Sequence, residues 1–155
     1  MQFKLVTKSD LELQKEFLLL ALWTPDNEPA HKPDILEVPH IKEYYSDWGK
    51  DGDIGFFALS PDNKPIGLIQ LRYKSSQTQK YADYPEIAMA VHPDYRGLGV
   101  ASSLMQHLID NSNSGLRLGV HPLNISAIKL YQKFGFCVYE VAKSGYPQMM
   151  REKQV

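Results

Sequence analysis

The sequence predicts one α/β (α+β) domain built on a single sheet of about seven strands. Two observations carry this prediction. The chain has 155 residues, which is enough for one domain with a buried core but not for two independent domains. Segments patterned as strands also outnumber those patterned as helices, and the two kinds alternate along the second half of the chain.

The N-terminal segment predicts a strand followed by a helix. Residues 2–5 alternate apolar and polar side chains, as a strand does. Ser9 and Glu12 have the spacing of a capping box, so a helix is expected to begin there and to end near Trp23.

The remaining elements follow from breakers and periodicity. Residues 24–39 contain four prolines, which interrupt regular structure and predict a long surface loop. Apolar residues at helical spacing then predict a short helix over 41–48, closed by Gly49. Turn residues separate the later elements. These are predicted strands at 54–59, 66–73, 86–91, 116–120, 137–142 and 148–151, and predicted helices at 99–111 and 124–134.

Charge and composition narrow the function classes. The chain has 17 basic and 18 acidic residues and no long basic run, so nucleic acid is not expected as a partner. No apolar run approaches membrane-spanning length and the N-terminus has no leader pattern, so a cytoplasmic location is expected and a membrane partner is not. The single cysteine, Cys137, excludes an internal disulfide and a cysteine metal cluster, and is expected to be a buried structural thiol.

The first functional signal lies in residues 86–108, where an apolar strand runs through Gly97 and Gly99 directly into an amphipathic helix. Glycine permits a tight turn, so that backbone amides converge on an anionic diphosphate at the positive end of the helix dipole. Arg96 adds a cation beside them. Alone, this turn has an equally good structural explanation, because glycine turns between strand and helix are common.

The second signal is a helix of residues 124–134. Asn124 is a natural N-cap for this helix, and Gly135 ends it before the next strand. By itself this segment is also explained by structure alone. Together and in this order, however, the two signals resemble the GCN5-related N-acetyltransferase (GNAT) superfamily. The residues that match its two motifs are Arg96, Gly99 and Ala101 in the phosphate-binding pattern and Asn124, Ala127, Leu130 and Tyr131 in the Asn-x-x-Ala-x-x-Leu-Tyr pattern.

The resemblance covers almost the whole chain and implies a single N-acetyltransferase domain over residues 1–155. It implies a mixed, mostly antiparallel sheet with helices on both faces, splayed where the cofactor inserts. Residues 48–55 further resemble a bacterial group of this family whose acceptors are unassigned. Homodimers are common among such relatives, so a homodimer is a possible assembly.

The resemblance also implies acetyl-CoA as the acyl donor, with no metal ion. The backbone of Met89, Ala90 and Val91 would pair with the pantetheine arm, and an amide of that strand would stabilise the oxyanion. Asn124 would contact the cofactor. The diphosphate would be held by Arg96 and by the amides of Gly97, Leu98, Gly99, Val100, Ala101 and Ser102.

Two residues are carried over from the family as catalytic. Tyr131 would donate a proton to the leaving thiolate, although a core tyrosine is the alternative. Glu86 would act as a base through water, whereas a merely solvated glutamate is the alternative. His121 is a second candidate base. Relatives that acetylate a ribosomal protein keep a glutamate where this chain has Gly119, which lowers the case for that substrate.

The predicted reaction is direct attack of a primary amine, on a small molecule or a peptide N-terminus, on acetyl-CoA in a ternary complex. The alternative is a non-catalytic acyl-CoA-binding sensor or interaction module. Residues 21–53 contain eight Asp or Glu against three Lys, a local charge of −5, which favours a cationic acceptor. A solvated acidic loop explains the same charge.

Overall fold

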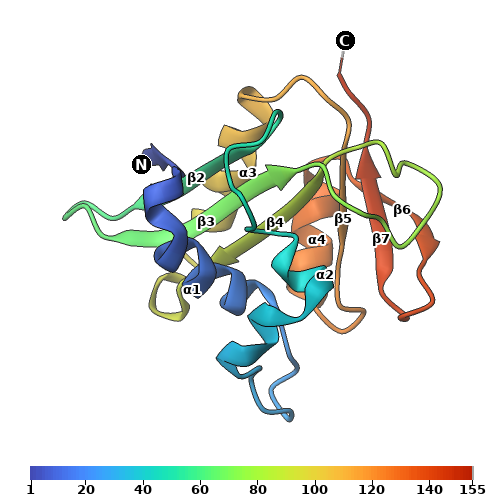
Figure 1. Ribbon diagram of the computed structural model, residues 1–155, viewed down its shortest axis with the longest axis horizontal. Helices are drawn as coiled ribbons and strands as arrows, with labels where there is room; N and C mark the ends of the chain where they lie inside the picture. The colour runs from blue at the N-terminus through green and yellow to red at the C-terminus, as the bar shows by residue number, and fades with distance from the viewer. Residues whose placement is uncertain (155) are drawn as a thin grey trace.

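One sheet of seven strands runs through the molecule in the order β1-β2-β3-β4-β5-β7-β6 (Figure 1). The computed structural model describes residues 1–154. All neighbouring strands are antiparallel except β4 and β5, which are parallel. The predicted mixed, mostly antiparallel sheet is therefore confirmed. The strands are β1 (Gln2–Leu5), β2 (Ile54–Leu59), β3 (Pro65–Arg72), β4 (Glu86–Val91), β5 (Leu116–Gly119), β6 (Cys137–Val141) and β7 (Pro147–Arg151).

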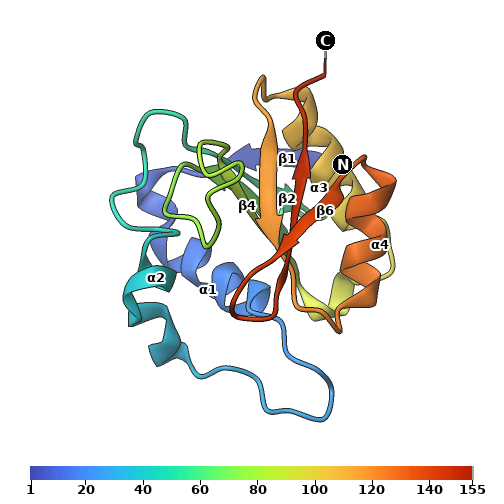
Figure 2. The same ribbon diagram turned by 90° about the vertical axis from the view of Figure 1, so that its right-hand side faces the viewer.

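Helices cover both faces of the sheet. Seen from the side, α1 and α2 lie on one face and α3 and α4 on the other (Figure 2). Each pair has its own core, because separate clusters of buried side chains lie beneath the two pairs. The helices are α1 (Leu11–Ala21), α2 (Pro39–Lys42), α3 (Val100–Asp110) and α4 (Ile125–Lys133), with short 3-10 turns at η1 (Lys8–Asp10), η2 (Pro33–Glu37) and η3 (Pro93–Tyr95).

Alternation along β4 makes the two faces unequal. Ile87 and Met89 pack in the core beneath α3 and α4, whereas Ala88 and Ala90 face α1 and α2. Along β4, large side chains therefore face α3 and α4, and small side chains leave room beneath α1 and α2.

The sheet opens between β4 and β5. Their ladder contains one pair of residues, Glu86 with Arg117, whereas β3 and β4 pair from Gly67 with Val91 to Arg72 with Glu86. Beyond that single pair, the edges of β4 and β5 that face each other are unpaired, whereas their other edges pair with β3 and β7. The predicted splay is confirmed at this point.

Two predicted details near the N-terminus are wrong. The capping interaction joins Thr7 and Asp10, whose carboxylate accepts the Thr7 amide at 2.8 Å, in place of Ser9 and Glu12. The reason is the 3-10 turn η1, which precedes α1 and brings Asp10 back over the turn. The second helix is also shorter than predicted, because α2 continues only as turns up to Asp47, whose positive φ of 53° ends it.

The prediction that Cys137 is buried is also wrong. The residue is exposed, because it begins β6, the outermost strand of the sheet. Its thiol lies 3.7 Å from the sulfur of Met150 on the neighbouring strand.

Candidate active site

A cavity of about 1100 Å³ lies where β4 and β5 separate. It is bordered by the ends of α1 and α2 on one face and by α3 and α4 on the other. Leu98 does not line it, and its side chain is 69% exposed. The other predicted site residues all line it, namely Glu86, Met89, Ala90, Val91, Arg96, Gly97, Gly99, Val100, Ala101, Ser102, Asn124 and Tyr131.

The turn before α3 offers a row of free amides. Gly97 and Gly99 have φ values of 76° and 80°, and a β-carbon at either would meet no atom within 4 Å. Glycine is needed there for its backbone angle and not for space. Within the described residues, the amides of 97–102 donate to no backbone or side-chain acceptor. They stand at the positive end of the α3 dipole and suit an anion.

The first residue of the second motif, Asn124, has a structural role on the far side of the opening. Its Oδ1 caps α4 by accepting the Ala127 amide at 3.3 Å. The side-chain amide nitrogen of Asn124 makes no hydrogen bond within residues 1–154 and remains available at the cavity.

Tyr131, the second motif residue, packs beside Phe136, with ring centroids 6.0 Å apart. Burial raises the pKa of Tyr131 to about 12, so the hydroxyl is protonated at neutral pH. That hydroxyl has no hydrogen-bond partner among the described residues. A protonated donor therefore lines the cavity.

Glu86 lies at the base of the opening, in a buried network. One carboxylate oxygen accepts from Arg117 Nη1 at 2.7 Å, and the other accepts from the Tyr44 hydroxyl. The Lys74 ammonium lies 3.8 Å from the second oxygen and 4.4 Å from the centroid of the Tyr44 ring. Glu86 is 9% exposed, so the simple solvated glutamate is not what the structure contains.

Arg117 fixes this network to the backbone. Its Nε donates to the Tyr84 carbonyl at 2.7 Å, and its Nη2 donates to the Lys74 carbonyl at 2.8 Å. Burial, followed by the Glu86 charge, raises the pKa of Tyr44 well above its usual value. Tyr44 is thus a hydrogen-bond donor to Glu86. The sequence analysis missed Arg117 and Lys74, and it did not predict the contact of Tyr44 with Glu86.

Residues 18–136 match the model of the Acetyltransferase (GNAT) family. The chain belongs to this family. It is 28% identical over 120 residues to N-alpha-acetyltransferase 50 of Danio rerio, across 74% of this chain and 70% of that protein. It is 30% identical over 128 residues to streptothricin acetyltransferase A of Bacillus subtilis (strain 168), across 76% of this chain and 66% of that protein.

A solved structure shares the fold. It is a GNAT superfamily phosphinothricin acetyltransferase from Sinorhizobium meliloti in complex with AcCoA, with a TM-score of 0.70 and 15% identity. The match covers 98% of this chain and 88% of that one. The predicted family, the predicted fold and the enzyme class of acetyltransferase are confirmed.

His121 also lines the cavity of this GNAT chain, and one of its ring nitrogens is already hydrogen-bonded. Nδ1 accepts the Leu123 amide at 3.1 Å, so in the neutral ring the proton is on Nε2. The ring packs against Trp23 and Tyr146, with centroids 4.9 and 5.2 Å away. In this tautomer Nε2 is a donor, and the Nδ1 lone pair already accepts the Leu123 amide.

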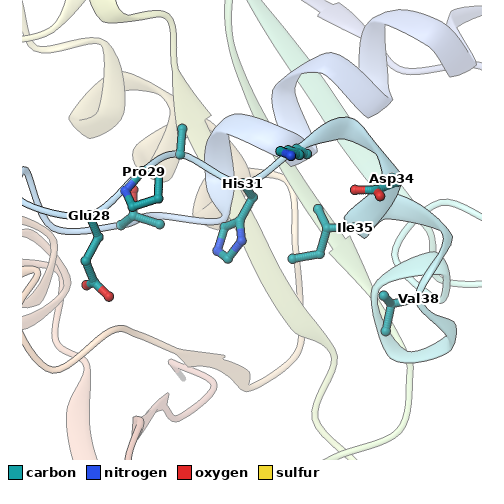
Figure 3. Close-up of a pocket in the computed structure, with 9 residues that line it drawn as sticks. Glu28, Pro29, His31, Asp34, Ile35 and Val38 are labelled. Atoms are coloured by element: carbon teal, nitrogen blue, oxygen red, sulfur yellow. The ribbon is translucent and has the colours of Figure 1, made fainter.

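The acidic residues of 21–53 do not line the cavity, whose only acidic residue is Glu86. Asp53 is buried in an ion pair with Arg72 at 2.7 Å. Glu28 and Asp34 line an adjoining pocket of about 580 Å³, formed by the loop after α1, which shares His31 and Ile35 with the cavity (Figure 3). The local charge of −5 is therefore not carried by the residues that line this cavity.

No helix in residues 1–154 is long and apolar enough to cross a membrane. No group of three or more His, Cys, Asp or Glu side chains in that range is arranged to hold a metal ion.

Proposed function

We propose that residues 1–155 form one N-acetyltransferase domain that transfers the acetyl group of acetyl-CoA to a primary amine, on a small molecule or at a peptide N-terminus. One observation carries the proposal. Gly97 and residues 99–102, whose amides are free, border the same cavity between β4 and β5 as Tyr131 and Glu86.

Acetyl-CoA would enter through the opening of the sheet. The amides of 97–102 and the Arg96 guanidinium suit the diphosphate. The unpaired edge of β4 at Met89, Ala90 and Val91 suits the pantetheine arm, which would pair with it as an added strand. An amide of this edge would donate to the oxyanion that develops at the thioester carbonyl.

The reaction is a direct attack. The amine nitrogen bonds to the thioester carbonyl carbon, the carbon–sulfur bond breaks, and the leaving thiolate takes a proton from Tyr131. The amine loses its proton through water to Glu86, which Arg117 and Tyr44 hold in place. This arrangement needs no metal ion and no covalent enzyme intermediate.

Tyr131→Phe tests the assignment. We expect kcat to fall about tenfold or more, because the thiolate loses its proton donor. Thiol release from acetyl-CoA measures kcat, and isothermal titration should find the Kd for acetyl-CoA nearly unchanged. The matched control is Tyr139→Phe, since the Tyr139 hydroxyl bonds Thr78 and does not line the cavity.

The pH dependence adds a second test. Because the pKa of Tyr131 is about 12, wild-type kcat should show no fall with rising pH below about pH 11. An alkaline fall near the ordinary tyrosine pKa of about 10 would contradict a buried Tyr131 donor. Tight acetyl-CoA binding with no thiol release from any amine would instead favour the non-catalytic sensor.

A further inference from the structure

Gln148 lies on the acceptor side of the sheet opening. It pairs in register with Gly119 of β5, and its neighbour Met149 pairs with Leu118. Leu118 and Met149 both point into the core beneath α3 and α4. Strand alternation therefore turns Gly119 and Gln148 to the opposite face, where both line the cavity.

Gly119 also lies beyond the last paired residue of the parallel strands. The β4–β5 ladder ends at Glu86 and Arg117, and Gly119 stands two residues further along β5. The same step along β4 leads to Ala88, which has no partner on β5. Gln148 thus borders the gap between the strands and not their paired part.

The residue Gln148 is buried, but only one of the two polar atoms of its side chain makes a hydrogen bond within residues 1–154. The residue is 3% exposed, and its Nε2 donates to the Tyr146 carbonyl at 3.1 Å. That carbonyl can only accept, so the bond fixes which end is nitrogen and which is oxygen. Within residues 1–154, Oε1 meets no hydrogen-bond donor. This oxygen is not sealed from solvent, and Gln148 lines the cavity, so Oε1 is an accessible acceptor for a ligand there.

Gly119 makes the space that this side chain occupies. A β-carbon on Gly119 would lie 2.9 Å from Gln148 Nε2 and 3.4 Å from Oε1. Any larger residue at 119 would push the amide out of its position. The amide of Gln148, and not a side chain from β5, therefore forms this part of the wall.

We propose that Gln148 Oε1 accepts a hydrogen bond from the attacking amine and orients it toward the thioester. This inference rests on the proposed function. The oxygen neither gains nor loses a proton, so Gln148 is a positioning residue for the acceptor, and proton removal is left to water and Glu86. Because the amide is uncharged, it stabilises the ammonium form of the acceptor less than a carboxylate would.

The test uses two variants of the full chain and acetyl-CoA. The acceptor probe is whichever of 2-phenylethylamine, L-leucinamide and spermidine is acetylated fastest by the wild type. Gln148→Met keeps the length of the side chain and removes the hydrogen bond, so kcat/KM for the amine should fall about tenfold. The Kd for acetyl-CoA should stay within about twofold of the wild-type value, since Gln148 is not among the residues proposed to bind the cofactor.

Gln148→Glu supplies a readout that a structural role would not move. It keeps an acceptor oxygen and adds a charge that stabilises the bound ammonium, which raises the pKa of the acceptor. The pH profile of kcat, which reports pKa values in the bound complex, should therefore shift to higher pH, with activity recovering toward the wild type above neutrality. An unshifted profile would overturn the proposal.

Gly119→Ala tests the same contact without changing Gln148, in case a Gln148 variant does not fold. Its β-carbon displaces the amide without removing it, and the same fall in kcat/KM for the amine is expected. If the wild type is active and kcat/KM for the amine is unchanged in both Gln148→Met and Gly119→Ala, the role of Gln148 is overturned. The proposed function then still stands. A wild type that releases no thiol with any amine would overturn the proposed function as well.

Discussion

The two sides of the sheet opening are built from different parts of the chain. On the side of α3, the groups suited to the cofactor are backbone amides of one continuous segment, 97–102. On the side of α1 and α2, the polar groups are side chains from distant segments. These are Tyr44, Lys74, Glu86, Arg117, His121 and Gln148.

The difference has a functional consequence. A backbone site depends on φ angles and on the absence of β-carbons, so most side chains around it can change without altering what it binds. A site made of side chains can be changed by one substitution. We therefore expect the cofactor to be common to relatives of this fold and the acceptor to differ among them. Three predictions test this contrast.

The largest effect should come from Arg117, which joins β4 and β5 at their single pair within residues 1–154. Arg117→Met leaves the Glu86 carboxylate buried without its main partner and should lower the free energy of unfolding by about 3 kcal/mol. Urea denaturation measures the change. The control is Lys42→Met, which removes an exposed pair with Glu37 and should cost about 0.5 kcal/mol or less. If both variants lost the same free energy of unfolding, the buried pair of Arg117 and Glu86 would not stabilise the α1 and α2 side of the opening.

The next effect concerns the backbone side. Gly99→Glu places a negative side chain on the turn and strains its positive φ, so the Kd for acetyl-CoA should rise about a hundredfold. Gly145→Glu is a matched control, because Gly145 has a φ of 89°, equally open surroundings and no place in the cavity. Isothermal titration compares them. A similar rise in the Kd for acetyl-CoA in both variants would show that backbone strain, and not loss of the diphosphate-binding turn, weakens binding.

The sequence was a good guide to the backbone side. The strand at 86–91 has the predicted bounds, and α3 differs from its predicted range by one residue at each end. Strand alternation, glycine turns and helix caps are local patterns, so the residues that create them lie next to one another in the chain.

The same patterns could not describe the side-chain side. Glu86 meets Arg117 from a separate strand, and Gln148 meets Gly119 across a whole helix and strand. Sheet topology, and not spacing along the chain, brings these residues together. Counting charges over 21–53 failed for the same reason, because the count did not show that Asp53 is neutralised by Arg72. The sequence around Glu86, at the start of its strand, gave no sign of its buried partners.

The smallest effect concerns the choice of acceptor. In the cavity lining the only acidic residue, Glu86, is already paired, and apolar side chains such as Trp23 and Ile41 border the same chamber. A second positive charge would lose its hydration there without gaining a free carboxylate. The kcat/KM for 2-phenylethylamine should therefore exceed that for spermidine, by about tenfold or less.

Removing acidic residues outside the cavity distinguishes selection of the acceptor by the cavity lining from electrostatic attraction of the acceptor by the acidic loop. Asp26→Asn with Asp34→Asn should leave the ratio of the two kcat/KM values unchanged, because neither residue lines the chamber. A selective fall in spermidine acetylation would mean that the acidic loop attracts the acceptor before it enters, since steering acts on association from a distance. The effect would then weaken with added salt, whereas selection by the chamber lining would persist.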